Sequence, residues 1–381
     1  MEQHDFKSHI LTFISKNPNN WIDLLTAEPY NLKIKSDGSF HIFNYNQILS
    51  DMSSPICQEA RGFIINNTLD RVVCRSFNKF FNYGETHAAK IDWYSAVVQE
   101  KIDGSLIRYW YNRADRRWNV STSGMIDAYK APLSDGMTFG DLFDRALGAI
   151  GNPTLALEEE YTYVFELVSP ENRIVVNYPT VRIYHIGTFL NRTGEEIKDD
   201  IIAHIDGKRV IIPKPAVYHI KSLIDCLDVS MKMGTNEEGF VVVDKDCNRI
   251  KIKSPAYLAA HKIKGNGSMT NERIIEIIKA NAVDDIIGTF PEFTDKIRAV
   301  EDRLKETLDI ILHETGISHF GLQREMKRAE FATYVNTLEG RFRQFLFHWY
   351  DKKYELSNCR NYCYEYIMSK PNSKIAELIG V

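Results

Sequence analysis

The hydrophobic pattern divides the chain near residue 260 into a first part rich in strands and a second part made of helices. In the first part, short apolar or alternating runs are separated by Asp, Asn and Gly residues, which is typical of strands joined by turns. Ser36-Asp37-Gly38 separates the first two of these runs and predicts a hairpin over residues 32–43. Further strands are predicted at residues 62–65, 106–111, 163–165 and 239–243.

Helical spacing of apolar residues predicts three helices in the first part. They run from the N-terminus (from Phe6) to about Lys16, over residues 139–150 with Thr138 as N-cap, and over residues 223–233. After Pro255 this spacing dominates, over residues 271–280, 293–311, 339–350 and 373–379. We therefore expect an α+β domain over residues 1–260, followed by an all-helical domain over residues 261–381.

The composition is that of a globular protein and excludes a disordered chain. Of the 381 residues, 44% are hydrophobic and 26% are charged, with a formal net charge of −4. No apolar run approaches the roughly 18 residues that a membrane span needs, and the N-terminus lacks the features of a secretory signal. We expect a cytoplasmic protein without membrane contact, in which any nucleic-acid binding depends on a local basic patch.

The six cysteines are too few and too scattered for a disulfide framework. Cys359 and Cys363 lie one helical turn apart, with no second Cys or His pair at zinc-site spacing. This pattern favours two reduced thiols over a metal site.

The clearest sign of chemistry is Lys101-Ile102-Asp103-Gly104-Ser105, which lies between two predicted strands. Taken alone, this sequence fits a hairpin turn with an incidental lysine better than it fits a catalytic site. It gains weight from other segments that occur in order along the chain. These are Glu59–Gly62, Arg75–Asn82, Val164–Leu167, Asn236–Val241 and Lys251–Ser254.

The ordered set resembles the nucleotidyltransferase motifs of covalent ligases and capping enzymes, and most closely those of the bacteriophage RNA ligase 1 family. In that family a Phe-Glu-hydrophobe element is followed by Asn-Arg-Ile-Val, which matches Asn172–Val175 here. The resemblance spans essentially the whole chain. It implies a nucleotidyltransferase (adenylation) domain of antiparallel sheets with flanking helices, followed by a helical C-terminal domain.

Covalent nucleotidyl transfer requires an amine that attacks the α-phosphorus of ATP, and Lys101 is the candidate. Because an ordinary lysine has a pKa of about 10.4, making this amine neutral at pH 7 costs roughly 4.6 kcal/mol. Lys251 and Lys253 share one strand face, where they would bind phosphates and help to neutralise Lys101 by repulsion. A solvated strand face is the alternative for this pair.

The resemblance also implies the acidic part of the site, with Mg²⁺ (or Mn²⁺) as cofactor beside ATP. In this interpretation Glu166 contacts the ribose hydroxyls, and Glu238 acts near the metal. Asp284 matches a family position linked to metal, although the pair Asp284-Asp285 equally fits the start of a helix. Solvated carboxylates at strand ends are the alternative for the two glutamates.

Arg61 and Lys79 complete the predicted phosphate-binding side. In the family the arginine position serves ligation with the RNA 5′-phosphate, and the lysine position contacts a nucleotide phosphate. Tyr45 and Tyr257 match family positions near the nucleotide, and the pair Phe80-Phe81 would pack under or beside it. A core position for at least one of the two phenylalanines is the alternative. One departure is Ser121-Thr122-Ser123-Gly124, where the family often has Lys-x-Lys-Gly.

The resemblance therefore implies an ATP-dependent RNA ligase that acts in RNA repair. Lys101 would take AMP from ATP and pass it to an RNA 5′-phosphate, and an RNA 3′-hydroxyl would then displace AMP. The helical domain would select the substrate, for which a nicked tRNA is a candidate, in the cytoplasm of the infected host if the source is a virus. Arg108, Arg173 and Arg182 are candidate RNA contacts.

Two other functions stay open on these residues. A DNA ligase or a GTP-using capping enzyme shares the Lys-x-Asp-Gly chemistry but normally carries an OB-fold where this chain has helical periodicity. A non-catalytic RNA-binding protein with the same fold would be expected to lack the nucleophile or an acid. Lys101, Glu166 and Glu238 are all present.

Overall fold

The structure of the protein, a computed structural model, describes residues 7–133, 136–234, 236–258, 269–280, 283–289, 293–315, 326–337, 343–352 and 358–381. The chain forms two compact units. The first consists of Met1–Asn19, Ile34–Tyr45 and Met52–Asn266, and the second of Asn20–Lys33, Asn46–Asp51 and Gly267–Val381. The sequence pattern did not predict that two short N-terminal segments belong to the second unit.

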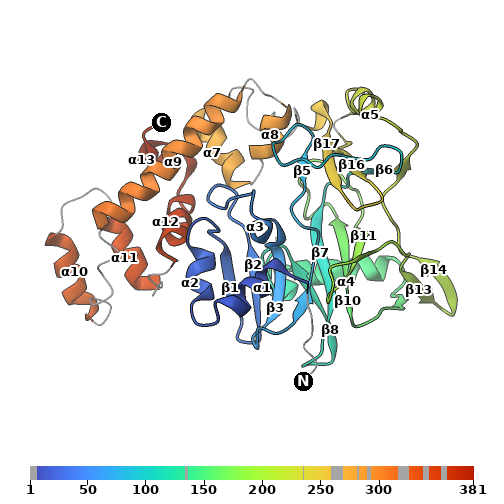
Figure 1. The fold of residues 1–381 in the computed structure, drawn as a ribbon, viewed down its shortest axis with the longest axis horizontal. Coiled ribbons are helices and arrows are strands. Elements are labelled where there is room, and N and C mark those ends of the chain that lie inside the picture. Colours follow the sequence, from blue (N-terminus) through green and yellow to red (C-terminus); the bar gives the residue numbers. More distant parts are fainter. Residues whose placement is uncertain are drawn as a thin grey trace. The chain divides into compact units, whose positions relative to one another are not determined.

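Four sheets form the described part of the first unit (Figure 1). In spatial order, one sheet holds β1 (Lys33–Ser36), β2 (Phe40–Asn44), β3 (Arg61–Asn66) and β4 (Val72–Cys74). A second holds β12 (Glu196–Ile197), β11 (Arg182–Leu190), β10 (Tyr161–Val168), β7 (Ser105–Asn112) and β8 (Arg117–Thr122). A third holds β15 (Val217–Tyr218), β6 (Val97–Glu100), β16 (Gly239–Val243), β17 (Arg249–Lys253) and β5 (Phe81–Asn82). The small fourth sheet holds β14 (Lys208–Ile211), β13 (Ile202–Ile205) and β9 (Thr154–Leu155).

These sheets confirm the α+β expectation and the predicted strands. The pairings are antiparallel in the described residues, with β17 and β5 as a parallel exception. The predicted hairpin over 32–43 is the pair β1–β2. The helices of this unit are α1 (His9–Lys16), α3 (Pro55–Glu59), α4 (Phe139–Ala149), α5 (Leu223–Ser230) and a short 3₁₀ helix at Ala128–Lys130. Phe6, at the predicted start of the first helix, lies outside the described residues.

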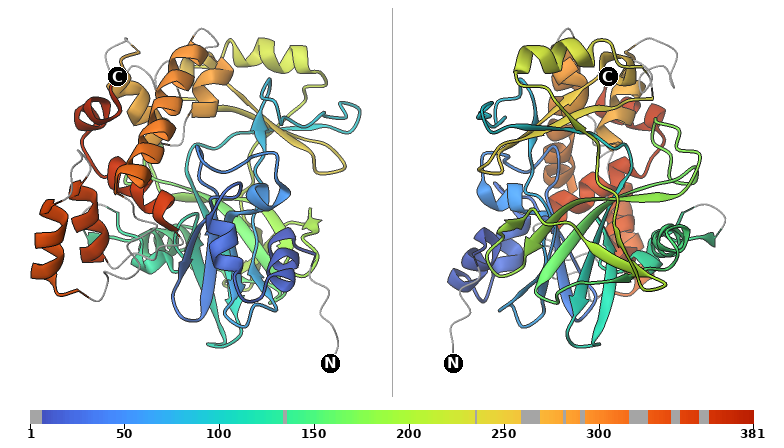
Figure 2. Two further views of the ribbon diagram at one scale, coloured as in Figure 1. Left: turned by 60° about the vertical axis from the view of Figure 1, so that its left-hand side comes forward. Right: turned by 90° about the vertical axis from the view of Figure 1, so that its right-hand side faces the viewer.

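The two faces of the β10–β7 pair have different partners because strand side chains alternate. Helix α4 lies on one face of this sheet (Figure 2). Ile107 and Phe165 point to that face, where they form a buried cluster with Leu142 and Phe143 of α4. Thr138 caps this helix as predicted, since its hydroxyl accepts a hydrogen bond from the Asp141 backbone N–H. Helix α4 therefore covers one face of the β10–β7 pair, and the side chains of the other face have different neighbours.

The opposite face of β7 packs against the first sheet. Trp110 is fully buried there among Phe40, Ile42 and Ile64. Residues of β10 and β7 that share this face include Val164 and Glu166, paired with Arg108 and Leu106. Glu166 therefore lies on the same face of the sheet as the buried Trp110 layer, toward the end of β10.

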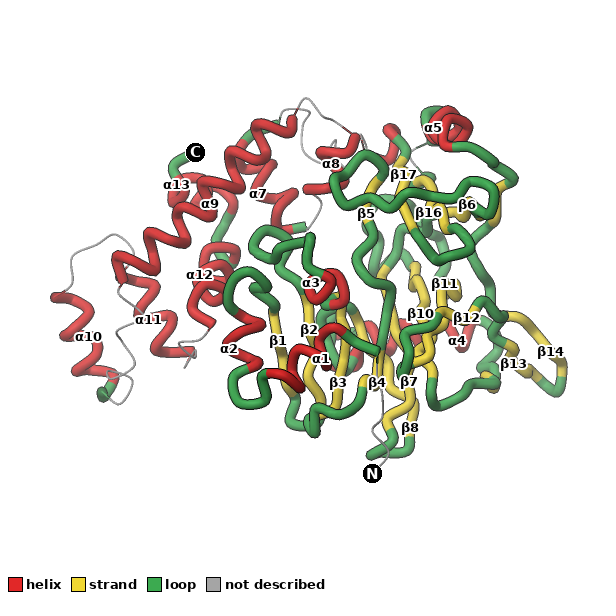
Figure 3. The backbone as a smooth tube through the Cα atoms, viewed as in Figure 1, coloured by secondary structure: helices red, strands yellow, loops and turns green. Residues whose placement is uncertain are grey.

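The second unit is helical in its described residues after 269 (Figure 3). Its helices are α2 (Trp21–Thr26), α7 (Asn271–Lys279), α8 (Val283–Thr289), α9 (Thr294–Thr315), α10 (Arg328–Thr337), α11 (Arg343–Lys352), α12 (Cys359–Met368) and α13 (Asn372–Ile379). The apolar residues that predicted the longest helix, such as Ile297, Leu304 and Ile311, are buried on one side of α9. The helical periodicity of the sequence is confirmed by these elements.

Asn361 of α12 holds the two N-terminal segments in this unit. Its side-chain amide donates to the Thr26 and Leu32 carbonyls, both at 3.4 Å, and accepts from the Asn46 side chain at 3.3 Å. Because Asn361 is 2% exposed, these bonds satisfy polar groups that burial would otherwise leave unpaired.

The cysteines are free thiols, and Cys359 and Cys363 are both buried in α12. Burial raises the pKa of the Cys363 thiol, with the neighbouring Cys359 acting in the same direction. The described helices include none with both the length and the apolar character needed to cross a membrane.

Candidate active site

Lys101 lies in the connection that carries the chain from one sheet to another. Strand β6, before it, belongs to the sheet with β16 and β17, whereas β7, after it, belongs to the sheet with β10. The segment is therefore not the turn of a hairpin, which was the simplest alternative interpretation of this sequence. The Lys101 backbone N–H donates to the Gly239 carbonyl at 2.9 Å, which fixes the lysine beside the start of β16.

A buried carboxylate joins two of the predicted lysines. Glu238 Oε2 lies 2.7 Å from Lys101 Nζ, and its Oε1 lies 2.9 Å from Lys253 Nζ. Glu238 is 3% exposed, and burial alone would raise the pKa of its carboxyl group. The two ammonium groups outweigh burial, so the pKa of Glu238 is lowered from its ordinary value. The structure therefore brings together three residues that are far apart in the sequence.

Two glycines allow the strands to approach closely at this point. Gly239 has a φ of +137°, and a Cβ there would lie 2.1 Å from the Ile252 carbonyl oxygen. A Cβ on Gly104 would lie 2.5 Å from the Leu167 carbonyl oxygen, beside Glu166. Because no side chain fits at either position, the glycines next to Glu238 and Asp103 are required by the backbone geometry.

Asp103 holds three parts of the chain together at the site, a role that the sequence did not reveal. Its Oδ2 accepts from the backbone N–H groups of Val175 and Val176 at 2.9 and 2.8 Å. Its Oδ1 accepts from the Tyr257 hydroxyl at 2.9 Å. Asp103 is 4% exposed, so this carboxylate is committed to holding chain segments and not to binding a ligand.

The Asn-Arg-Ile-Val segment docks on the same loop. The Asn172 side chain donates to Ser105 Oγ at 3.0 Å and to the Leu167 carbonyl at 2.8 Å. The spacing of this segment after the Phe-Glu element was the only sequence signal for this contact. Tyr257, predicted near the nucleotide, is 2% exposed and acts through its bond to Asp103 in this state.

Glu166 is the second acidic group of the site. It lies on β10, partly buried, and interacts electrostatically with Lys101, Glu238 and Arg61. Burial raises the pKa of Glu166 to about 7, against the opposing attraction of Lys101. The carboxyl group therefore changes charge near neutral pH, where a ligand or a cation can decide its state.

We expect this titration to be visible in the pH dependence of unfolding. Because the folded pKa of about 7 is above the ordinary glutamate pKa of 4.5, the stabilising effect of the bound proton is complete below about pH 4.5 and is lost as pH rises through 7. Relative to Glu166→Gln, the free energy of unfolding of the wild type should fall by up to about 3 kcal/mol over this window. Urea denaturation at several pH values measures it. The exposed Glu159→Gln is the control, and parallel wild-type and Glu166→Gln curves would refute the shift.

Arg61 and the other predicted cations lie on aromatic rings. The Arg61 guanidinium lies 5.2 Å from the Phe80 ring centre, and Lys251 Nζ lies 5.6 Å from the same ring. Lys79 Nζ lies 5.2 Å from Tyr45 and 5.4 Å from Phe81. Such contacts hold cations without neutralising them, which suits groups that must bind phosphates.

The strand face predicted for Lys251 and Lys253 is confirmed. Both are partly buried, and they alternate with Ile250 and Ile252, which are buried on the other face of β17. Arg61 Nη1 is buried and has no hydrogen-bond partner. An unsatisfied guanidinium nitrogen on a ring that Lys251 also contacts fits an anionic ligand such as a phosphate.

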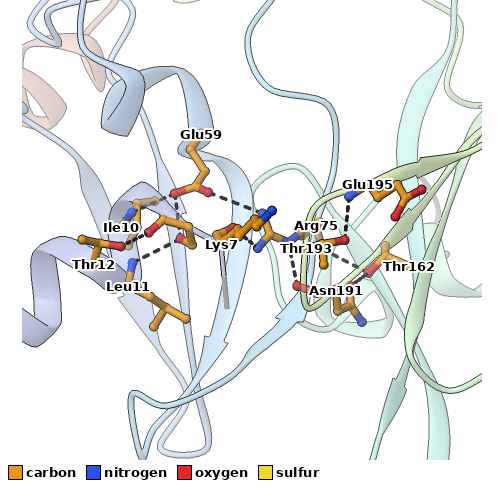
Figure 4. A network of polar contacts seen from close by, with 11 residues as sticks. Lys7, Ile10, Leu11, Thr12, Glu59, Arg75, Thr162, Asn191, Thr193 and Glu195 are labelled. Carbon is orange, nitrogen blue, oxygen red and sulfur yellow. Dashed lines mark hydrogen bonds and ion pairs between the residues drawn. The ribbon is translucent and has the colours of Figure 1, made fainter. Parts of the chain in front are cut away.

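The segment that carries Lys79 is anchored at its start by Arg75 (Figure 4). Arg75 Nε donates to the Asn191 carbonyl at 2.8 Å, its backbone N–H donates to Thr162 Oγ1 at 3.0 Å, and Nη1 lies 3.5 Å from Glu59 Oε1. Arg75 and Glu59 also line a cavity of about 830 Å³. Lys101, Glu166 and Glu238 do not line this cavity, so we place the chemistry at the ion-pair cluster.

Three sequence predictions need separate comment. Arg108, a candidate RNA contact, is 0% exposed and cannot touch RNA in this structure, whereas Arg173 and Arg182 are exposed. Ser121 is also buried and accepts a hydrogen bond from the Trp110 indole, so it does not replace a phosphate-binding lysine. Asp284 lies on α8 in the helical unit, where it interacts electrostatically with Glu301.

The acidic residues present fit a divalent cation that is bound mainly through phosphate oxygens. In the described part of the chain, no group of three or more His, Cys, Asp and Glu side chains could hold a metal by itself. Glu238 and Glu166 interact with each other, and both are hard oxygen donors of the kind that Mg²⁺ and Mn²⁺ prefer.

Comparison with known proteins identifies the family. A family described as RNA ligase matches residues 59–257, which is more than half of the chain. A putative bifunctional polynucleotide kinase/RNA ligase of Autographa californica nuclear polyhedrosis virus is 31% identical over 300 residues, covering 72% of this chain and 41% of that protein. The chain thus spans less than half the length of this relative.

Two phage proteins are also similar. The RNA ligase of Rhodothermus phage RM378 is 25% identical over 374 residues, covering 80% of this chain and 83% of that protein. RNA ligase 1 of Bacteriophage TS2126 is 26% identical over 265 residues, covering 65% of this chain and 62% of that protein. The region that matches the family contains Arg61, Lys101, Glu166 and Glu238, whose side chains interact in this structure. The chain belongs to the RNA ligase family.

Proposed function

We propose that this protein is an ATP-dependent RNA ligase that joins RNA 5′-phosphate and 3′-hydroxyl ends. The observation that carries the proposal is the ion-pair cluster in which one buried carboxylate, Glu238, holds both Lys101 and Lys253. Glu166 and Arg61 are close enough to this cluster to interact with it electrostatically. A nucleophilic amine, phosphate-binding cations and acidic groups thus share one site, as covalent nucleotidyl transfer requires.

In the first step, the neutral Lys101 amine attacks the α-phosphorus of ATP. A P–N bond forms, the P–O bond to pyrophosphate breaks, and the amine proton is lost to the solvent. In the second step, an oxygen of the RNA 5′-phosphate attacks the same phosphorus and displaces the lysine. In the third step, the RNA 3′-hydroxyl attacks the 5′-phosphorus, and AMP leaves with the bridging oxygen. Lys101 is the nucleophile of the first step and the leaving group of the second, so it is regenerated in every cycle.

The remaining residues have roles that follow from their charge and position. Lys251 and Lys253 would bind phosphate oxygens, and Glu166 would accept hydrogen bonds from the ribose hydroxyls. Arg61, with its unsatisfied Nη1, would take the RNA 5′-phosphate. The nucleotide would lie against Tyr45, Lys79 and Phe81, where Lys79 already contacts both rings. Tyr257 would contribute to nucleotide binding through its bond to Asp103.

Mg²⁺ or Mn²⁺ would be held by Glu238, and the metal-binding role of Asp284 stays a prediction from the sequence. Such a cation would neutralise charge on the phosphates during transfer. A carboxylate that binds a cation no longer satisfies the ammonium group of Lys101. In this scheme Glu238 would exchange the Lys101 ammonium group for the cation, and the Lys101 amine would then be free to react.

We further propose that residues 1–260 act as the adenylation domain and that residues 261–381 select the RNA. Exposed Arg173 and Arg182 are the candidate contacts with the RNA backbone. Nicked tRNA is the proposed substrate, and RNA repair in the cytoplasm the proposed setting.

The test is incubation with α-labelled ATP or GTP, with and without a 5′-phosphorylated RNA or DNA oligomer. We expect covalent label from ATP only, and transfer of that label to the RNA. Label from GTP would indicate a capping-type enzyme, and equal transfer to DNA would indicate a DNA ligase. A protein that takes label from neither nucleotide would contradict covalent catalysis.

A further inference from the structure

Arg108 is a buried cation without a counter-ion. It lies on β7, is 0% exposed, and donates one hydrogen bond, from Nη2 to the Thr122 carbonyl. Its Nε and Nη1 have no hydrogen-bond partner, and none of the ion pairs in the described part of the chain includes it. Natural proteins rarely keep such a group, because burial of an unpaired charge opposes folding.

The second buried arginine of this unit shows what a structural role looks like. Arg75, which is 6% exposed, faces Glu59 and also donates to the Asn191 and Lys7 carbonyls at 2.8 and 2.6 Å (Figure 4). Arg108 has one such carbonyl contact, to Thr122, and no ion pair in the described part of the chain. Burial lowers the pKa of Arg108, the Cys74 thiol opposes this effect, and Arg61 adds to it by repulsion.

The position of Arg108 connects it to the site. Its β10 partner is Val164, which lies on the same face as Glu166. Its guanidinium packs against the Gly62 backbone, because a Cβ on Gly62 would lie 2.3 Å from Arg108 Nη1. Gly62 has a φ of +72° and follows Arg61, so the backbone at the catalytic arginine leaves room for the second guanidinium.

Arg61 therefore lies between a repulsive group and attractive ones. Arg108 repels it, and the carboxylate of Glu166 and the ring of Phe80 attract it. Arg61 Nη1 has no partner either. Two guanidinium groups with unsatisfied nitrogens thus repel each other, and among the described residues no carboxylate forms an ion pair with Arg108.

We propose that Arg108 is a positioning residue for Arg61. The buried positive charge of Arg108 holds the Arg61 guanidinium toward Glu166, and a substrate phosphate bound there completes the hydrogen bonds of Arg61. This inference depends on the proposed function for the identity of the anion, an RNA 5′-phosphate. The effect of the buried Arg108 charge on the position of Arg61 does not depend on the proposed function. An anion at Arg61 would relieve the repulsion between the two arginines, so binding and positioning support each other.

The first measurement is the Tm of Arg108→Met without ligand. Replacing an unpaired buried cation by an apolar chain of similar length should leave the Tm unchanged or raise it by about 2 °C or more. The matched control is Arg75→Met, which removes a buried arginine with an acidic partner and should lower the Tm. Inorganic pyrophosphate should raise the Tm of the wild type more than that of Arg108→Met. A fall for Arg108→Met as large as that of the control would overturn the inference, whether or not the protein is a ligase.

The second measurement is the transfer of AMP from the adenylylated protein to 5′-phosphorylated RNA. Arg108→Met should slow this step by about tenfold to a hundredfold, because a displaced catalytic group loses its alignment. Arg108→Lys, which keeps the charge, should retain more of the rate. In the Arg61→Ala background, Arg108→Met should cause no further loss, since it acts through Arg61. An equal loss in both backgrounds would show that Arg108 does not act through Arg61.

Discussion

Lys101→Ala should abolish the labelled protein–AMP band that forms with ATP. The replacement removes the amine whose nitrogen forms the covalent bond, and no other group in the cluster can substitute for it. Lys253 is the nearest alternative amine in the cluster, since it shares Glu238 with Lys101, but its side chain comes from a different strand. Gel electrophoresis after incubation with labelled ATP measures the result, and we expect the band to fall below detection.

Lys90→Ala is the control for this experiment, because Lys90 is exposed and lies outside the cluster. It should be labelled as strongly as the wild type. If Lys101→Ala protein still carried label, another residue would be the nucleophile, and the proposed role of the Lys-x-Asp-Gly segment would be wrong. Thermal unfolding of the variant distinguishes loss of the amine from loss of the fold.

Glu238→Gln should reduce the rate of protein–AMP formation by about a hundredfold to a thousandfold, the usual effect of removing one charged group from a transition-state site. The substitution keeps the shape of the side chain but removes the charge that pairs with two ammonium groups. Breaking such a buried pair from one side should also lower the free energy of unfolding by roughly 3 kcal/mol. Single-turnover labelling and urea denaturation measure the two effects.

The neighbouring residue provides a matched control, since Glu237 is exposed and precedes Glu238 directly. Glu237→Gln should change neither the labelling rate nor the stability by a measurable amount. A Glu238→Gln protein as active as this control would mean that the buried carboxylate serves only to hold the lysines, and the metal would then need another ligand.

Features that depend on neighbouring residues could be predicted from the sequence, because strand alternation, helical periodicity and capping follow from local backbone geometry. Strand alternation placed Lys251 and Lys253 on one face, and the structure confirms it. Helical periodicity predicted the buried side of α9, and Thr138 was identified as a cap from its position before an apolar run. Each of these features depends on residues close together in the chain, for which spacing alone determines the geometry.

Contacts between distant segments could not be predicted in the same way. No local pattern indicated a role for Asp103, although its carboxylate accepts hydrogen bonds from the Val175 backbone N–H and the Tyr257 hydroxyl. The sequence assigned Arg108 to the RNA surface, because a basic residue in a strand has no local sign of being buried. The insertion of residues 20–33 and 46–51 into the helical unit was missed for the same reason.

The sequence by itself thus determined which groups are available for chemistry, the alternation of strands and the periodicity of the helices. Only the tertiary structure decided which of these groups meet, which carboxylate pairs with which lysine, and which arginine is buried. The physical reason is that periodicity depends on bonds along the backbone, whereas burial and ion pairing depend on how sheets pack. The packing of Gly62 over Arg108, and of Gly239 against Ile252, is a property of the folded chain alone.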